Sequence, residues 1–213
     1  MRIIPFIIGM LAACQHHVGS DAARSRTPEV PAAEESALLE QDPPFGPVAL
    51  ALGFPSLRDT DLPSGYREVR IADNYSWIAG QRTPMLRLQQ SPHGLTGELI
   101  EFWREGTESS ASRGRCVKDG ELRVCAAATS VPNIAWDTVA DRLSEYGAWD
   151  ISARCENLMT VYDAGDLLIQ RRDGDLFETY SCNAPRSRLE SNVGRQAAAI
   201  FSYIFLLTRS ARN

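Results

Sequence analysis

The chain has 213 residues, of which 44% are hydrophobic and 23% charged, an ordinary composition for a globular protein. Its 27 Asp and Glu residues outnumber its 22 Lys and Arg residues, which gives a net charge of −5. A mildly acidic chain without a basic block gives no reason to expect a nucleic acid partner. The length predicts one folded domain.

The first fourteen residues, MRIIPFIIGMLAAC, have the pattern of an export signal. Arg2 supplies the positive charge, residues 3–10 form a short apolar run, and small residues precede Cys14. The run is far shorter than the roughly 20 apolar residues that span a bilayer, which argues against an uncleaved anchor. We therefore expect residues 1–13 to be a signal peptide.

The sequence Leu-Ala-Ala-Cys at residues 11–14 resembles the lipobox of bacterial lipoproteins. The resemblance implies that Cys14 carries diacylglycerol, that cleavage precedes it, and that the membrane is a partner through this lipid. It implies a location in the cell envelope, and Gln15 favours the periplasmic side of the outer membrane in a Gram-negative cell. The alternative is an ordinary signal peptide in which Cys14 is incidental.

Residues 14–47 are rich in Ala, Pro, Ser and Glu and contain few large apolar side chains. Such a segment cannot bury enough surface to offset the entropy of ordering it. We expect a disordered tether over 14–47 and a single domain over 48–209.

Three segments of this domain have the alternation of strands. Residues 66–73 and 85–90 each place apolar side chains on one face, with a polar face toward water. Residues 97–105 carry apolar side chains on both faces, which predicts a central strand.

The four cysteines that follow, Cys116, Cys125, Cys155 and Cys182, predict two disulfides in an exported protein. We favour Cys116–Cys125 and Cys155–Cys182 among the three pairings. The first pair lies in a hairpin with arms near 114–118 and 122–128. A two-residue turn at Asp119-Gly120 would place the cysteines diagonally, so we expect a four-residue loop over 119–122, or a bulge, that sets them opposite each other.

A helical period follows over 133–146, with Asn133 as a plausible cap and Gly147 as a stop. A second hairpin is expected to turn at Asp173-Gly174, with Leu167 opposite Tyr180. The last element is a helix over 191–208, capped by Ser191 or Asn192. Its residues 197–207 are apolar almost all round, which predicts burial.

Successive strands and hairpins favour antiparallel pairing. The predicted fold class is therefore α+β, a mainly antiparallel sheet with two hairpins, covered by two helices at about 133–146 and 191–208. A parallel α/β sheet is less favoured because βαβ alternation is missing.

The sequence contains no recognisable catalytic motif. His93 lies in a turn-like Pro-His-Gly sequence without a neighbouring nucleophile or acid. Four carboxylates, Asp163, Asp166, Asp173 and Asp175, fall within thirteen residues, but they lack the spacing of a calcium loop. We expect no catalytic residues, no metal site and no cofactor, and we lean away from an enzyme.

Exposed contacts are the remaining route to function. Trp77, next to Tyr75 in a predicted loop, is the best candidate for a binding contact, because Trp combines apolar area with a donor. The final helix could close the core or form an interface.

The run from Trp136 to the alanine-rich final helix also resembles a pattern in bacterial exported proteins of no known activity. The leading hypothesis is a lipid-anchored envelope domain that binds or scaffolds an envelope protein. One alternative is an envelope hydrolase that uses Asp163, Asp166 and Asp175. The other is either a protein inhibitor or a carrier of a small apolar ligand.

Overall fold

The structure is a computed structural model that describes residues 45–73, 81–105, 114–129, 134–151, 155 and 165–211. Cys14, Tyr75, Trp77 and Asp163 lie outside these residues, as does the predicted cap Asn133.

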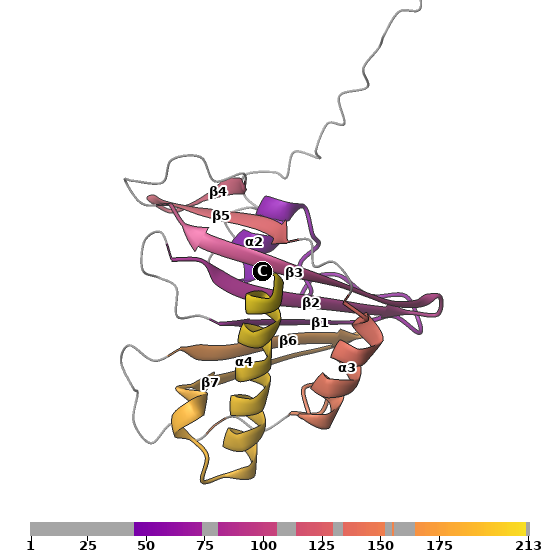
Figure 1. Ribbon diagram of the computed structural model, residues 1–213. Coiled ribbons are helices and arrows are strands. Elements are labelled where there is room, and N and C mark those ends of the chain that lie inside the picture. Colours follow the sequence, from indigo (N-terminus) through magenta and orange to yellow (C-terminus); the bar gives the residue numbers. More distant parts are fainter. Residues whose placement is uncertain are drawn as a thin grey trace, which may run out of the picture.

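Seven strands form one antiparallel sheet in the order β4-β5-β3-β2-β1-β6-β7 (Figure 1). The strands are β1 Arg67–Asp73, β2 Thr83–Ser91, β3 Gly94–Arg104, β4 Arg115–Asp119, β5 Leu122–Thr129, β6 Asp166–Asp173 and β7 Leu176–Asn183. The predicted α+β class and antiparallel sheet are confirmed.

The helices are α2 Phe45–Leu52, α3 Trp136–Glu145 and α4 Asn192–Ala211, with a 3-10 turn η1 at Pro185–Ser187. The prediction of two covering helices was one short, because α2 is a short segment containing Gly46 and Pro47 and has no clear helical period. It begins three residues before the expected domain start at residue 48. Of the two predicted caps of α4, Ser191 is the one observed, since its hydroxyl accepts a hydrogen bond from the Gly194 amide at 2.9 Å.

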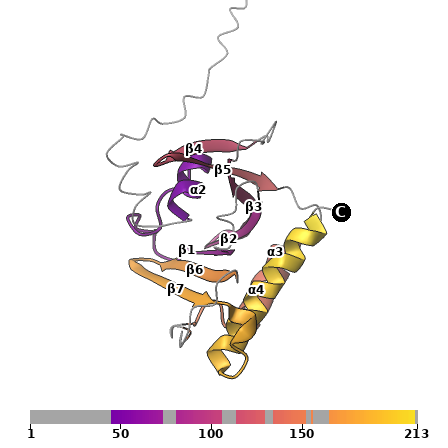
Figure 2. The same cartoon turned by 90° about the vertical axis from the view of Figure 1, so that its left-hand side faces the viewer.

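The sheet curls around α2, while α3 and α4 lie against the other face (Figure 2). Each face has its own apolar core. On the α2 side, Phe45 and Val48 pack on Ile100 and Phe102. On the α3/α4 side, Ile71 and Leu86 pack with Ile200 and the other residues of the larger cluster.

The prediction of a wet face on β1 was wrong. Val69 and Ile71 face the larger core as expected, but Glu68, Arg70 and Ala72 on the opposite face are also buried. The charged side chains are accommodated because Glu68 accepts hydrogen bonds from Arg70 and from Arg87 of β2, at 2.8 Å in each case. Periodicity alone does not distinguish this covered polar face from a solvated one.

Both predicted disulfides are present. Cys116 bonds to Cys125 and Cys155 bonds to Cys182. The ladder pairs Cys116 directly with Cys125, the register that a four-residue loop would give, but it also pairs Asp119 with Leu122. The connection is therefore the two-residue turn Gly120-Glu121.

The second hairpin shows a two-residue shift from the predicted register. Leu167 pairs with Cys182, not Tyr180, and Asp173 pairs with Leu176, so the turn is Gly174-Asp175. Gly120 and Gly174 both have positive φ, at 62° and 57°, and both occupy the first turn position. A glycine there is typical of a type II′ turn, whereas the prediction placed Asp first.

Candidate functional site

The carboxylates considered for hydrolysis do not meet within the described residues. Asp166 opens β6 and accepts a hydrogen bond from the Asn183 amide at 2.6 Å, while Asp173 closes the same strand. Eight residues of strand separate these ends by roughly 23 Å. A paired-carboxylate mechanism needs a separation of less than about 10 Å, so Asp166 and the turn residue Asp175 cannot form such a pair.

His93 is exposed in the tight turn between β2 and β3, where its amide donates to the Ser91 hydroxyl at 3.2 Å. Glu105 lies beside the sulfurs of Cys116 and Cys125, but sulfurs bonded to each other are not thiolate ligands. Neither place offers the groups that catalysis or metal binding requires.

The buried charges on the α2 side form a structural cluster. Glu68 is 1% exposed, and its carboxylate contacts two guanidinium groups, Arg70 and Arg87. Burial alone would raise the pKa of Glu68, but the hydrogen bonds and charges of Arg87 and Arg70 together lower it. Phe54 covers the cluster, with the Arg87 guanidinium 4.2 Å from its ring centroid. Glu68 and Arg70 are therefore buried structural charges, while Arg87 reaches the surface beside Glu98.

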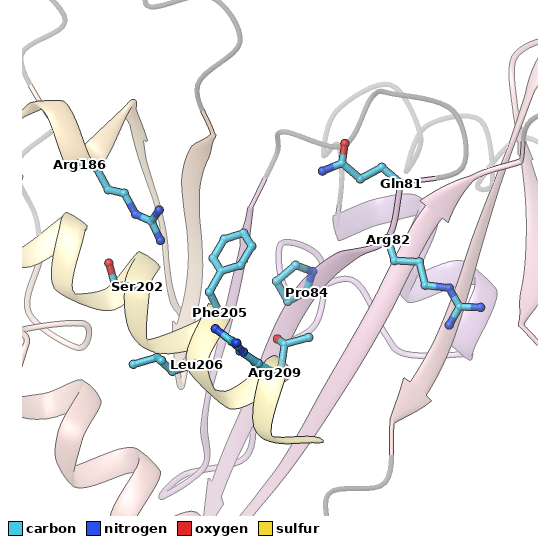
Figure 3. Close-up of a pocket in the computed structure, with 9 residues that line it drawn as sticks. Gln81, Arg82, Pro84, Arg186, Ser202, Phe205, Leu206 and Arg209 are labelled. Atoms are coloured by element: carbon cyan, nitrogen blue, oxygen red, sulfur yellow. The ribbon is translucent and has the colours of Figure 1, made fainter. Parts of the chain in front are cut away.

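An open groove of about 830 Å³ lies between the last turns of α4 and the start of β2 (Figure 3). Its volume falls in the range of small-molecule sites, roughly 300–1,000 Å³. The lining residues come from three segments: Gln81, Arg82, Pro84, Arg186, Ser202, Phe205, Leu206, Thr208 and Arg209.

The apolar wall of the groove comes from α4. Phe201, Ile204 and Thr208 of this helix face inward and are buried. Phe205 and Leu206 lie on the adjacent face and are 38% and 62% exposed. The prediction that residues 197–207 are buried all round was therefore wrong at the carboxyl-terminal turns, where two large apolar side chains remain accessible.

The cationic groups of the groove flank Phe205. Arg186 is placed by η1, where Pro185 is buried after the left-handed Ala184, whose φ is 50°. The Arg186 guanidinium lies 5.3 Å from the Phe201 ring centroid and 5.8 Å from that of Phe205. Arg209 follows Phe205 by one helical turn, so the two side chains are neighbours on the helix surface.

Arg82 has a different role from these two arginines. It donates to Glu101 at 3.0 Å and stacks on Trp103 at 4.7 Å, and it points away from Phe205 (Figure 3). Within the part of the chain that the structure describes, neither Arg186 nor Arg209 forms an ion pair. Among the described residues, the groove therefore presents two arginines without an ion-pair partner beside one aromatic ring.

A second, smaller hollow of about 220 Å³ lies near Trp149. Its arginines are balanced by carboxylates: Arg171 pairs with Glu178, and Asp150 and Asp173 line the same hollow. Arg67 stacks on the Trp149 ring at 4.6 Å. These contacts hold the loop after α3 against the sheet and leave little unsatisfied polarity for a ligand.

None of the groove residues was a predicted contact, although the final helix as a whole was a candidate interface. The signal in the sequence was the position of Phe205 and Leu206 directly after the inward-facing Ile204, next to Arg209. Arg82 could not be associated with them before the fold was known, because more than a hundred residues separate it from α4. Arg186 is close in sequence, but its position depends on the η1 turn, which was not predicted from the sequence.

Comparison with known proteins finds no family model, no curated protein and no solved structure that matches this chain. Among the described residues, no helix has the length and apolarity needed to cross a membrane.

Proposed function

We propose that this protein is a lipid-anchored protein of the cell envelope whose folded domain is a binding module, with the groove beside α4 as its site. The lipobox-like residues 11–14 support the anchor, with Cys14 as the acylated residue. The two disulfides support an oxidising compartment outside the cytoplasm, since such bridges seldom persist among cytosolic thiols.

The observation that carries the binding role is the pair Phe205 and Leu206. The free energy of folding favours burial of large apolar side chains, at roughly 25 cal/mol per Å² removed from water. These two side chains stay exposed in a groove, next to two arginines that form no ion pair with any other described residue, while Phe201, Ile204 and Thr208 of α4 are buried. An occupant of the groove would recover that burial.

Cross-linking from the groove in the native envelope tests this role. A photoreactive phenylalanine analogue at Leu206, 62% exposed, is compared with the same analogue at Leu176, 57% exposed in the β6–β7 hairpin. We expect a discrete adduct from Leu206 and none from Leu176. Equal labelling at both positions, or no adduct from Leu206, would contradict a binding site in the groove.

The anchor is tested separately by mass spectrometry of the mature amino terminus. We expect an acylated Cys14 and a membrane-associated protein, and a Cys14→Ser variant that leaves the membrane fraction. An unmodified thiol at Cys14 would remove the proposed address and leave the groove unaffected as a binding site.

A further inference from the structure

We propose that the groove takes an anionic single-chain amphiphile, with an alkyl or acyl chain against α4 and a carboxylate or phosphate between Arg186 and Arg209. This inference rests on the proposed function, because it names the ligand class of the same groove.

The charge of the groove selects an anionic group. Arg186 and Arg209 flank Phe205 from η1 and from the next turn of α4, and both are exposed. Guanidinium groups present several N–H donors in a plane, which suits the oxygens of a carboxylate or phosphate. Glu101 of β3 accepts from Arg82, and among the described residues neither Arg186 nor Arg209 has a carboxylate within ion-pair distance.

The wall of the groove selects an alkyl chain. Phe205, Leu206 and Pro84 provide apolar surface on both sides, from α4 and from β2 (Figure 3). For an alkyl chain laid along this wall, each methylene removed from water would contribute about 0.8 kcal/mol to the free energy of binding. The anionic end and the apolar wall adjoin, so a ligand with both properties satisfies the groove better than a free anion does.

The backbone of the groove disfavours an extended peptide. From Met85 to Gln90, β2 is paired with β1 on one side and with β3 on the other, and Pro84, which lines the groove, has no amide hydrogen to donate to a peptide. The Thr208 hydroxyl of α4 already donates to the Ile204 carbonyl at 2.9 Å. An extended peptide would leave most of its amide groups without partners here, whereas an alkyl chain has none to satisfy.

The size of the groove selects a free amphiphile over a membrane surface. An open groove of about 830 Å³ between a helix and a sheet has the volume of a small-molecule site. Contact with a bilayer would instead need a broad outward face of apolar and basic side chains.

The test measures binding by calorimetry on the full chain carrying Cys14→Ser, so that the protein's own acyl group cannot compete. Decanoate and decyl phosphate are the anionic probes, 1-decanol is the uncharged probe, and inorganic phosphate is the free anion. Vesicles of anionic phospholipid represent the membrane. We expect saturable one-to-one binding of an anionic amphiphile that exceeds the binding of decanol and of phosphate.

Three variants separate the two parts of the ligand. Arg186→Gln with Arg209→Gln should weaken decanoate and decyl phosphate at least tenfold and leave decanol unchanged. Leu206→Ser should weaken charged and uncharged chains alike. The matched controls are Arg142→Gln, an exposed arginine on α3, and Leu176→Ser, and both should bind as the parent does.

Failure of the anionic probes to bind, an equal loss of decanol in the double arginine variant, or binding to vesicles alone would overturn the proposal. If Leu206 still forms a discrete adduct in the envelope, the groove remains a binding site and only the ligand class is wrong. If Leu206 forms no adduct and decanoate does not bind, both proposals fail.

Discussion

Glu68 is a buried carboxylate on the α2 side of the sheet. Its carboxylate is 1% exposed and contacts Arg70, equally buried, as well as Arg87. Removing one member of a buried ion pair leaves the other charge in a medium of low polarity, at a cost of about 3–5 kcal/mol. We therefore expect Glu68→Gln to lower the free energy of unfolding by that amount in urea titrations.

Glu98 provides the control for this prediction. It pairs with the same Arg87 at 3.1 Å but is 42% exposed, so water screens the interaction. Glu98→Gln should cost less than about 1 kcal/mol. Equal losses for the two variants would mean that burial does not strengthen the Glu68 interaction.

The lowered pKa of the Glu68 carboxylate should make the free energy of unfolding depend on pH. The pKa of Glu68 is lowered in the folded state, so its stabilisation is present above the ordinary glutamate pKa of about 4.3. It is lost as the pH falls through the lower folded pKa. The stability gap between the parent and Glu68→Gln should therefore narrow below about pH 4, as measured by urea titration across pH. A gap that stays constant to pH 2 would contradict it.

The raised pKa of Tyr180 should lower the stability of the fold at alkaline pH. Burial raises its pKa to about 12, although a hydrogen bond with Cys155 opposes the shift. Its neutral form is favoured by folding, so this stabilisation is complete below the unfolded pKa of about 10 and is lost as the pH rises to about 12. Tyrosinate absorbance should show a late step that Tyr180→Phe removes.

At the scale of elements, the two hairpins show what local sequence could and could not predict. Both contain Asp-Gly, and in both the glycine takes the first turn position, with Asp as the last paired residue. The first hairpin was predicted in its correct register because Cys116 and Cys125 had to face each other. The second contains no pair of cysteines, so nothing in its sequence corrected the two-residue shift.

The helices show the same dependence on context. α3 was predicted from its helical period and α4 from a capped, long apolar run, whereas α2 is eight residues long and depends on the curled sheet for its burial. The groove was not predicted, since it needs residues of η1 and β2 beside α4. A helix that is apolar all round is predicted to be buried, but only the fold shows that the sheet leaves one end of α4 uncovered.

The two disulfides should differ in their contribution to stability. Cys116–Cys125 closes a separation of 9 residues and Cys155–Cys182 one of 27. Loop-closure entropy in the unfolded chain then predicts losses of about 2.5 and about 3.5 kcal/mol when each pair is replaced by alanines. Urea titrations of the two double variants test this order. A larger loss for Cys116→Ala/Cys125→Ala would show that the hairpin contacts outweigh chain entropy.

At the scale of the whole molecule, the sheet separates two cores that depend on different parts of the chain. The larger core needs α3 and α4, which follow most of the sheet in sequence. The smaller core needs α2, which precedes every strand and inserts Phe45 and Val48 into the curl of the sheet. The expected tether, residues 14–47, therefore overlaps the first three residues of α2, a helix that packs against the sheet.

Truncation tests this division of the chain. A protein that begins at residue 45 keeps α2 and every core residue of the two clusters, so it should unfold cooperatively with a Tm close to that of the chain from residue 14. A protein that begins at residue 53 loses the apolar side chains of α2 and exposes Ile100 and Phe102 to water. We expect a Tm lower by at least 10 °C, or no cooperative transition, because losing two or more buried large side chains costs several kcal/mol. Equal thermal unfolding of the two truncated proteins would mean that α2 is not part of the cooperative unit, and that the sheet is held by α3 and α4 alone.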